Sequence, residues 1–496
     1  MVCKSINSYI DVIRERIIEI HGICNDYGKR QIKHISYNSR DVREGTLFIC
    51  KGASFRKDYL KSAIKKGAIC YVADKRWTED IPGIIVDDVR ESISLVSGHF
   101  YNNIWNKKLD IVGITGTKGK STTAFLIKAV LDSYHQRIGD GNTALISGIY
   151  NYDGREKQKA TLTTPETLEL HKLLAESVDN CCDTLVMEVS SQGLKYKRVH
   201  GIKYKIGVFL NIGIDHISEG EHLSFEDYFQ SKMEIFKQCD IACINIDMED
   251  EYLFPILDNA IINNCRIVTF GTKKGAMYRG KLVKESLTSL KFELSDNGID
   301  YLIDACLGGG YNLSNILAAI AVCKELGASI IDIKNGLSNV EIPGRMEVFD
   351  MPNKDSKIIV DYAHNEMSYN SLFESINRNY PNYKRIFMFG CAADRALNRR
   401  REVAKIAIKE ADRVVITKYD NGKETFEEIS KEILRNIRAE CGLENALMEE
   451  VDIIEDRTSA IEFCINNIED GWILIMTGCE SDSKTVKEYL KRCYKL

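Results

Sequence analysis

Short runs of apolar, often β-branched residues alternate with longer stretches in which apolar and charged residues recur at helical spacing. This alternation is typical of a parallel sheet whose strands are joined by crossover helices. The runs that predict strands of a first sheet are LDIVGIT (109–115), TLVMEVS (184–190), IGVFLNI (206–212), IACINID (241–247) and RIVTFGT (266–272). The pattern therefore predicts an α/β fold.

Three further parts of the chain extend this pattern. A second series of apolar runs, each followed by a charged amphipathic stretch, begins near residue 357 with KIIVDYAH, RIFMFG, RVVITKY and WILIMTG. Before residue 108, runs near 46–50 and 69–73 predict a smaller α/β unit. The segment 289–309 predicts antiparallel strands around an Asp-Asn-Gly turn, followed by a helix that starts near Asn312.

The length of 496 residues suggests about three domains, because a typical domain has roughly 100 to 200 residues. We place the boundaries where one series of strands gives way to the next. The expected domains are a small N-terminal α/β domain (1–107), a central domain with a parallel sheet (108–342) and a C-terminal α/β domain (343–496).

The composition, 44% hydrophobic and 28% charged residues, is that of a globular protein. The formal net charge of −5 comes from 67 basic and 72 acidic residues spread along the chain, so we expect neither nucleic acid nor a membrane as a partner. The N-terminus lacks the apolar core of a signal peptide, and no stretch approaches the roughly 18 apolar residues that cross a bilayer. We therefore expect a cytoplasmic monomer whose 16 scattered cysteines stay reduced.

The strongest chemical signal is a glycine-rich segment between the strand 109–115 and the helical run AFLIKAVL. Its glycines allow backbone N–H groups to close around phosphate oxygens, while Lys120 can reach the outer phosphates and the Ser121 hydroxyl can bind Mg²⁺. Gly113 lies one residue too early for GxxxxGK[ST], and a purely structural glycine turn is the alternative. The candidate nucleotide-binding residues are Gly116, Thr117, Gly119, Lys120, Ser121 and Thr122. We therefore predict a P-loop ATPase-like sheet in the central domain and a Rossmann-like sheet in the C-terminal one.

The segment GITGTKGKSTT (113–123) resembles the ATP loop of the Mur ligase superfamily, and further matches follow in family order over nearly the whole chain. Asn38-Ser39-Arg40 and Gly45-Thr-Leu-Phe48 resemble the uridine-nucleotide-binding domain of the branch that adds the third amino acid to UDP-N-acetylmuramoyl-dipeptide. Thr163-Thr164-Pro165-Glu166 resembles the substrate loop of that branch. The residues that the resemblance implies for binding the UDP-linked substrate are Ser39, Thr163, Thr164, Ser190 and Arg198.

The run Met187-Glu188-Val189-Ser190-Ser191, followed by Asn211 and Asp215-His216, resembles the family's central metal and substrate segments. Glu188 falls at the C-terminal end of an apolar strand, where open α/β sheets bind ligands. The resemblance gives Glu188 and His216 a role in holding Mg²⁺, and it makes Lys232 the lysine that becomes carbamylated and binds a second Mg²⁺. The implied metal ligands are Ser121, Glu188, His216 and Lys232, and the implied catalytic residues are Lys120, Glu188, His216 and Lys232.

Three segments resemble the family's remaining ATP contacts. Gly310-Tyr-Asn312-Leu-Ser-Asn315 resembles the segment that meets the adenine, and Pro343-Gly344-Arg345 resembles the hinge into the C-terminal domain. Asp361-Tyr-Ala-His364 is similar to a segment whose aspartate contacts the nucleotide. The resemblance therefore implies that Asn312, Arg345 and Asp361 bind ATP between the central and C-terminal domains. Domain closure would then exclude water from a hydrolysable acyl phosphate.

The C-terminal domain, which should select the amino acid, matches the family less closely. Gly390-Cys-Ala-Ala-Asp394-Arg395 is close to the family's GCGGDR, and the planar guanidinium of Arg395 can bind an amino acid carboxylate. The family's DNPR is replaced by Asp420-Asn-Gly-Lys423, and its GKGHE by Met476-Thr-Gly-Cys-Glu480. The implied amino-acid-binding residues are Arg395, Asn421, Lys423 and Glu480. These replacements leave the identity of the amino acid open.

The resemblance implies an ATP- and Mg²⁺-dependent ligase of peptidoglycan biosynthesis. It would convert a carboxylate of a UDP-N-acetylmuramoyl-dipeptide into an acyl phosphate and join it to an amino acid. Two alternatives remain open: a paralogue that uses the same chemistry on another carboxylate, such as a specialised metabolite, and a catalytically silent nucleotide-binding scaffold. The family's DGH is missing after Gly52 and a histidine is replaced by Gln192; these departures fit either sequence drift or such a paralogue. A polyglutamylating ligase is disfavoured because it lacks the N-terminal domain with Asn38-Ser39-Arg40.

Overall fold

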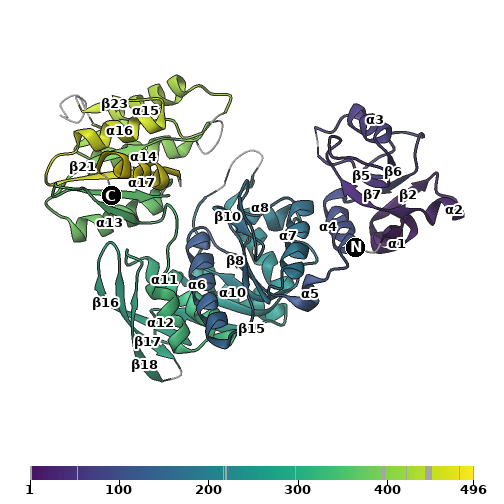
Figure 1. Cartoon of the computed structure of the whole chain (residues 1–496), viewed down its shortest axis with the longest axis horizontal. Coiled ribbons are helices and arrows are strands. Elements are labelled where there is room, and N and C mark those ends of the chain that lie inside the picture. Colours follow the sequence, from purple (N-terminus) through teal and green to yellow (C-terminus); the bar gives the residue numbers. More distant parts are fainter. Residues whose placement is uncertain are drawn as a thin grey trace.

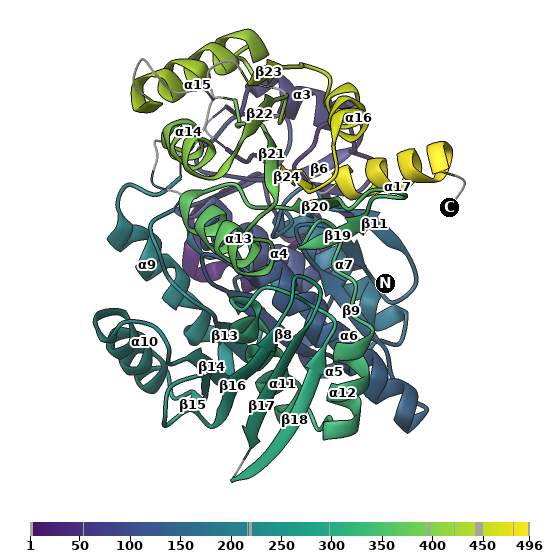
Figure 2. The same ribbon diagram turned by 90° about the vertical axis from the view of Figure 1, so that its left-hand side faces the viewer.

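The computed structural model describes residues 3–52, 54–215, 217, 221–296, 298–393, 397–420, 422–441, 450–479 and 481–494. Figure 1 shows three neighbouring parts, each built around its own sheet. The helices α4 (Val89–Phe100) and α5 (Trp105–Lys108) lead from the N-terminal part, drawn in purple, to the middle part. Figure 2 shows the C-terminal part above the middle part, with α13 (Glu366–Asn379) facing the central sheet.

The middle part contains an 11-stranded sheet in the order β11-β10-β9-β12-β8-β13-β14-β15-β16-β17-β18. In this order the strands from β9 to β16 are parallel, and the outer pairs at both edges are antiparallel. The strands are β8 (Asp110–Thr115), β9 (Thr143–Ile146), β10 (Tyr150–Tyr152), β11 (Lys157–Lys159), β12 (Thr184–Glu188), β13 (Tyr204–Phe209), β14 (Cys239–Asn245), β15 (Arg266–Gly271), β16 (Tyr278–Glu285), β17 (Leu290–Asp296) and β18 (Ile299–Ala305).

Helices cover both faces of the central sheet, which is why its inner strands are continuous apolar runs. The helices are α6 (Lys120–Ile138), α7 (Thr167–Asp179), α8 (Ser191–Lys195), α9 (Phe225–Met233), η2 (Glu234–Gln238), α10 (Asp250–Ile262), α11 (Asn312–Glu325) and α12 (Ile330–Ser338). On one face, α6, α11 and α12 share a core with Val112 and Ile114 of β8. On the other face, α7 and α10 share a core with Ile111. The middle part is therefore a doubly covered sheet.

The N-terminal part has a five-stranded sheet in the order β2-β7-β6-β5-β4 and a two-stranded sheet of β1 and β3. Its elements are β1 (Lys4–Ser5), α1 (Ile6–Val12), η1 (Arg14–Arg16), β2 (Ile17–His21), α2 (Asn25–Gly28), β3 (Gln31–Ile32), β4 (His34–Ser36), β5 (Thr46–Ile49), α3 (Lys57–Lys65), β6 (Ala68–Ala73) and β7 (Gly83–Val86). The carboxyl ends of β4 and β5 lead into the loops that carry Ser39 and Lys51.

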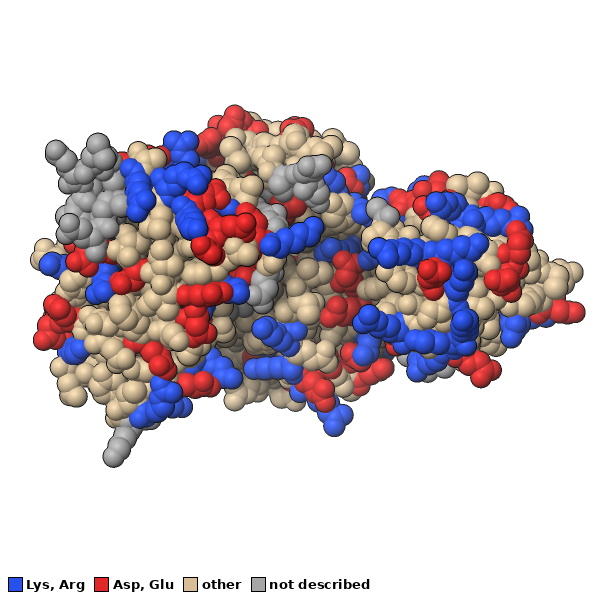
Figure 3. Space-filling view, turned by 90° about the horizontal axis from the view of Figure 1, so that it is seen from above, with Lys and Arg blue, Asp and Glu red and all other residues tan. Residues whose placement is uncertain are grey.

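The C-terminal part has a six-stranded sheet in the order β19-β20-β24-β21-β22-β23, parallel except for β19. Its remaining elements are β19 (Glu347–Asp350), β20 (Lys357–Asp361), β21 (Lys384–Phe389), α14 (Asn398–Glu410), β22 (Arg413–Ile416), α15 (Phe426–Cys441), β23 (Val451–Ile453), α16 (Arg457–Asn467), β24 (Trp472–Thr477) and α17 (Ser481–Tyr494). Figure 3 shows basic and acidic side chains interspersed on one face of the molecule.

The predicted α/β class and the predicted strands are confirmed, while several ends differ. The predicted strand 206–212 begins at Tyr204 and ends at Phe209, because Asn211 leaves the sheet to bond with Lys118 of the phosphate loop. The antiparallel pair β17–β18 flanks the predicted turn, whose Asn297 lies outside the described residues. The domain boundaries at 107/108 and 342/343 stay predictions. No described helix has the length and apolar character to span a membrane.

Candidate active site

The phosphate loop lies between the end of β8 and the start of α6. Gly119 has a φ of +84°, and an added Cβ would lie 2.2 Å from Oδ1 of Asn315, so only glycine fits. No side chain caps the first turn of α6, so its N–H groups remain available to an anion. Asn211 fixes the loop, because its Oδ1 accepts from the Lys118 N–H at 2.9 Å and its Nδ2 donates to the Lys118 carbonyl at 3.1 Å. The loop is therefore shaped for phosphate.

Two predicted lysines meet at one carbonyl of this loop. Lys120 Nζ donates to the carbonyl of Gly116 at 2.8 Å, and Lys232 Nζ from α9 donates to the same oxygen at 2.9 Å. Burial lowers the pKa of Lys120 and lowers that of Lys232 well below its usual range, and the Lys120 charge adds to the second effect. Lys232 is 1% exposed. The arrangement therefore favours the neutral amine of Lys232.

Glu188 is buried at the C-terminal end of β12, next to the phosphate loop. Its Oε1 accepts from the N–H of Gly148 at 2.7 Å, and its charge favours the protonated form of Lys120. Ser121, another predicted metal ligand, has its Oγ 3.4 Å from NH2 of Arg345. His216 lies outside the described residues. The three predicted metal ligands that the structure describes, Ser121, Glu188 and Lys232, thus lie around the phosphate loop.

The predicted substrate loop is attached to the same end of β12. Thr164 Oγ1 donates to the carbonyl of Glu188 and accepts from the N–H of Ser190, both at 2.9 Å. Thr163 is close enough to Gly148 that an added Cβ on that glycine would lie 3.5 Å from its Oγ1. Arg198 NH1 donates to the carbonyl of Thr164 at 3.1 Å. Thr164 therefore joins the end of β12 at Glu188 to Arg198.

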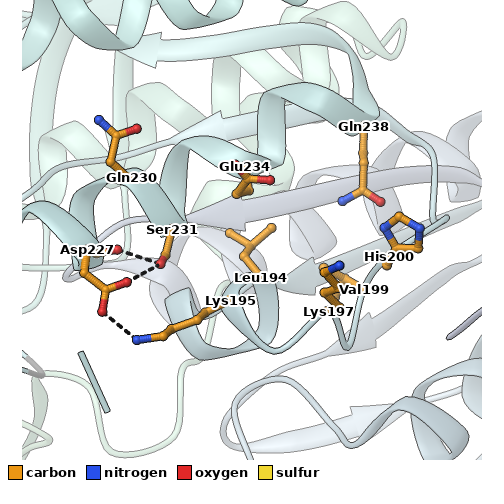
Figure 4. A pocket seen from close by; sticks show the side chains of 10 residues that line it. All are labelled: Leu194, Lys195, Lys197, Val199, His200, Asp227, Gln230, Ser231, Glu234 and Gln238. Carbon is orange, nitrogen blue, oxygen red and sulfur yellow. Dashed lines mark hydrogen bonds and ion pairs between the residues drawn. The ribbon is translucent and has the colours of Figure 1, made fainter. Parts of the chain in front are cut away.

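Ser190 and the ion pair between Lys195 and Asp227 fix the helices α8 and α9. Ser190 Oγ caps α8 by accepting from the N–H of Gly193 at 3.0 Å. A cavity of about 300 Å³ lies beside α8. Among its lining side chains, Lys195 points toward Asp227 of α9 (Figure 4). The hydrogen bond from Lys195 lowers the pKa of Asp227 to about 2. This pair joins α8 to the helix that carries Lys232.

Ser39 lies apart from this cluster, in the loop that follows β4 of the N-terminal sheet. Its carbonyl accepts from Lys66 Nζ at 2.9 Å. The N-terminal part reaches the substrate loop through Lys51, which forms an ion pair with Glu166. A substrate that contacts both Ser39 and Glu188 must therefore extend along the junction between the two parts.

The predicted nucleotide contacts of the C-terminal side also converge on the loop. Arg345 reaches Ser121 and lies over the ring of Tyr362 at 4.3 Å from its centroid. Both oxygens of Asp361 accept backbone N–H groups at 2.8 and 2.9 Å, and burial raises the pKa of this carboxyl. Asn312 at the start of α11 donates to the carbonyl of Gly308 at 2.7 Å and accepts from Asn315 at 2.9 Å. Asn315 in turn faces Gly119.

A cluster around Asp215, which we call the Asp215 hub, was missed by sequence reasoning. Asp215 Oδ2 accepts from Lys118 Nζ and from Asn365 Nδ2, both at 3.1 Å, and Oδ1 accepts from Arg399 NH2 at 2.9 Å. His364 completes the hub, with its Nε2 3.1 Å from Lys118 Nζ. The hub therefore joins the phosphate loop directly to the C-terminal part.

The tautomer of His364 follows from its two hydrogen bonds. Its Nδ1 lies 2.8 Å from the carbonyl of Tyr362, which can only accept, so Nδ1 carries the proton and Nε2 accepts from Lys118. Burial, followed by the charges of Lys118 and Arg399, lowers the pKa of His364 well below its usual range. Burial also lowers the pKa of Lys118 to about 8, although Asp215 opposes the shift. The hub thus depends on a neutral imidazole.

Of the predicted amino-acid-binding residues, only Lys423 lies in the described part, where it is exposed; Arg395, Asn421 and Glu480 lie outside it. Arg400, which is 1% exposed, contacts described residues beside two of these positions. Arg400 forms ion pairs with Glu424 and Glu432 and donates to the carbonyl of Ala392 at 3.1 Å. Arg400 therefore ties the chain at Ala392 to the chain at Glu424.

Comparison with known proteins gives a consistent result. The family described as "Mur ligase middle domain" matches residues 114–323, and that described as "Mur ligase, glutamate ligase domain" matches residues 344–479. A UDP-N-acetylmuramyl-tripeptide synthetase of Lactobacillus delbrueckii subsp. bulgaricus is 32% identical over 97% of this chain and 94% of its own. A UDP-N-acetylmuramoyl-L-alanyl-D-glutamate--L-lysine ligase of Streptococcus pneumoniae is 34% identical over 97% of this chain and 95% of its own.

The fold agrees with that of a solved relative. The structure of a UDP-N-acetylmuramoyl-L-alanyl-D-glutamate--2,6-diaminopimelate ligase superposes with a TM-score of 0.67 and 22% identity, covering 97% of this chain and 94% of the other. The similarity in sequence extends over nearly the full length of both the synthetase and the lysine ligase. By sequence and by fold, the chain belongs to the Mur ligase family.

Proposed function

We propose that this chain is an ATP-dependent ligase that joins an amino acid to a carboxylate of a UDP-N-acetylmuramoyl-dipeptide. The observation that carries the proposal is the meeting of the phosphate loop, Glu188 and the Thr164–Arg198 contact at the ends of β8 and β12. The phosphate loop suits a nucleotide phosphate, and the region of Thr164 and Arg198 suits a carboxylate. The relatives named as tripeptide synthetase and lysine ligase support the same reaction.

The chain's own residues divide the work between two substrates. Gly116 to Thr122 would bind the ATP phosphates, with Lys120 next to the phosphate that is transferred, while Asn312, Arg345 and Asp361 would hold the nucleoside side. Ser39, Thr163, Thr164, Ser190 and Arg198 would hold the acceptor. The acceptor carboxylate attacks the γ-phosphorus and ADP leaves; the amine then attacks the acyl carbon, and the adduct releases phosphate to give the amide.

Mg²⁺ fits this site, because Glu188 and the Ser121 hydroxyl are oxygen donors at the phosphate loop. His216 and a carbamylated Lys232 would complete the set. Bound there, Mg²⁺ would neutralise the charge of the triphosphate and of the attacked carboxylate. The low pKa of Lys232 supports its modification: a neutral amine attacks carbon dioxide, an N–C bond forms and one proton is released. The cation thereby becomes an anionic ligand.

The amino acid is the least constrained part of the proposal. The proposed contacts are Arg395, Asn421, Lys423 and Glu480. L-lysine is the first candidate, because similar proteins from three species are named as L-lysine ligases, at 33–34% identity. A ligase acting on another carboxylate is the second candidate, favoured by the altered sequences at Asp420–Lys423 and after Gly52. We place the reaction in the cytoplasm, in peptidoglycan synthesis, and carried out by a monomer.

The test is ADP release with ATP, Mg²⁺ and UDP-N-acetylmuramoyl-L-alanyl-D-glutamate, measured with lysine, diaminopimelate and ornithine in turn. We expect release with one amino acid, together with a product heavier by that residue. Lys120→Ala serves as the inactive control, because it removes the cation next to the transferred phosphate. No release with any amino acid, by a protein that still binds ATP, would contradict the muramoyl-dipeptide as acceptor.

A further inference from the structure

The junction between the N-terminal and middle parts contains two cations that share one carboxylate. Glu166 Oε1 lies 2.9 Å from NH2 of Arg198, and its Oε2 forms an ion pair with Nζ of Lys51. Lys51 follows β5 of the N-terminal sheet, whereas Glu166 and Arg198 belong to the middle part. We call Lys51 and Arg198 the cation clamp. Its present occupant is a side chain of the protein itself.

The side chain of Glu166 does not cap the helix that follows it. Glu166 is the N-cap residue of the 13-residue helix α7, but no hydrogen bond joins its side chain to that helix. The shorter side chains of Ser, Thr, Asp and Asn are the ones that usually cap the free N–H groups of a first turn, and Glu166 does not take that role here. The carboxylate is therefore held by the two cations and not by its own helix.

The clamp is preorganised independently of Glu166. Arg198 NH1 donates to the carbonyl of Thr164 at 3.1 Å, and Thr164 is bonded to both Glu188 and Ser190. Lys51 Nζ lies 4.7 Å from the centroid of the Tyr37 ring, next to the predicted uridine-nucleotide segment. Both cations thus keep a second contact when the carboxylate leaves.

The clamp is also open to exchange. The side chains of Lys51 and Glu166 are 27% and 26% exposed, and that of Arg198 is 13% exposed. Partly exposed ion pairs contribute little net free energy because water competes for both partners. An external carboxylate with the same geometry can therefore replace Glu166 at small cost.

This inference rests on the proposed function. We propose that the cation clamp binds the acceptor's second carboxylate, the one that is not phosphorylated, and that Lys51 is part of this binding site. Glu166 occupies the clamp in the free protein and is displaced when the acceptor binds. The clamp lies one loop away from Glu188, where the reacting carboxylate would be. An acceptor held at the clamp is thereby placed with its reacting carboxylate at the phosphate loop. Until then, Glu166 offsets one of the two positive charges.

The experiment compares Glu166→Gln, Lys51→Met and the control Glu169→Gln, which changes an exposed carboxylate in the first turn of α7. We expect Glu166→Gln to lower the KM for the acceptor by about two- to fivefold with kcat and the KM for ATP unchanged. Lys51→Met should raise the acceptor KM by a similar factor, and Glu169→Gln should change neither constant. With an acceptor whose non-reacting carboxylate is a primary amide, the gain of Glu166→Gln should disappear.

Two results would overturn the inference while leaving the proposed function intact: a raised acceptor KM in Glu166→Gln, or a gain that persists with the amidated acceptor. The first would make Glu166 a positioning residue of the substrate loop. The shift in Tm on adding acceptor without ATP gives the same comparison independently of turnover, and it should be larger for Glu166→Gln than for the parent. A parent protein that neither binds nor turns over the acceptor would contradict the proposed function itself.

Discussion

At the scale of single residues, the active site depends on groups that sequence can suggest but not place. Lys120 and Lys232 were both predicted, yet their meeting at one carbonyl oxygen brings together residues from α6 and α9. The motif predicts the lysine of the phosphate loop because its spacing is local. The second lysine has no local signal, and only the family resemblance suggested it.

Gly119 allows a sharp test of the phosphate loop. Gly119→Ala should abolish ADP release and lower the free energy of unfolding by about 1–3 kcal/mol, because the new Cβ combines a left-handed φ with a clash against Asn315. Gly139→Ala is the control, since Gly139 also has a left-handed φ, of +73°, but open space around it. Thermal unfolding and ADP release are measured for both. Full activity of Gly119→Ala would show that this glycine does not shape the site.

His364 predicts a dependence of stability on acidity. Because its folded pKa lies well below the unfolded value of about 6.5, the unfolded chain binds the proton more tightly, and stability falls as pH drops below about 6.5. The free energy lost should approach about 1.4 kcal/mol per pH unit. Chemical denaturation of the parent and of His364→Gln between pH 7 and 5 checks this. The advantage of the parent over the variant should shrink with acidity, and parallel pH profiles would refute the neutral-imidazole assignment.

At the scale of elements, the inner strands could be predicted because strands buried on both faces read as continuous apolar runs. The edge strands β10 and β11 were not predicted, since each has three residues and their sequences, such as Lys157–Lys159, are polar; the apolar β9 beside them was missed because it spans only Thr143–Ile146. The end of β13 was also misplaced, because Ile212 continues the apolar run after Asn211 has left the sheet. Side-chain bonding to another loop overrode the local pattern there.

The contacts of Arg400 join α14 to α15 and its preceding loop, next to the proposed amino-acid-binding residues. Arg400→Met should lower the free energy of unfolding by about 1–3 kcal/mol, because it removes the charged hydrogen bonds to two carboxylates that are themselves 32% and 38% exposed and can be hydrated. The KM for the amino acid should rise more than that for ATP, since the loops near Ala392 and Glu424 lose their common anchor. Arg401→Met is the control: Arg401 is 68% exposed, and its pair with Glu440 is worth less than about 1 kcal/mol. Equal effects of the two changes would contradict this role.

At the scale of the whole molecule, the Asp215 hub fixes the C-terminal part against the phosphate loop. It joins residues as far apart in sequence as Lys118 and His364, which are separated by 246 positions. Local patterns contain no information about such contacts, so sequence reasoning found the residues of the site but not the contacts that hold its two halves together.

Asp215→Asn should loosen this junction. The change leaves Lys118 and Arg399 facing each other without a buried anion, which costs about 3–5 kcal/mol. Small-angle X-ray scattering should then show a larger radius of gyration, and ADP release should fall. Arg378→Met, which breaks the more exposed contact with Glu285 across the same junction, should change the radius far less. An unchanged radius in Asp215→Asn would mean that other contacts suffice.

The shared carbonyl of Gly116 has a thermodynamic consequence. A nucleotide phosphate that draws Lys120 away leaves Lys232 alone at that oxygen and removes a neighbouring positive charge, which changes the proton affinity of its amine. Under the proposed mechanism, uptake of carbon dioxide by Lys232 and binding of nucleotide are then linked equilibria, each altering the other by the same factor. The dissolved carbon dioxide around the protein would set its apparent affinity for ATP.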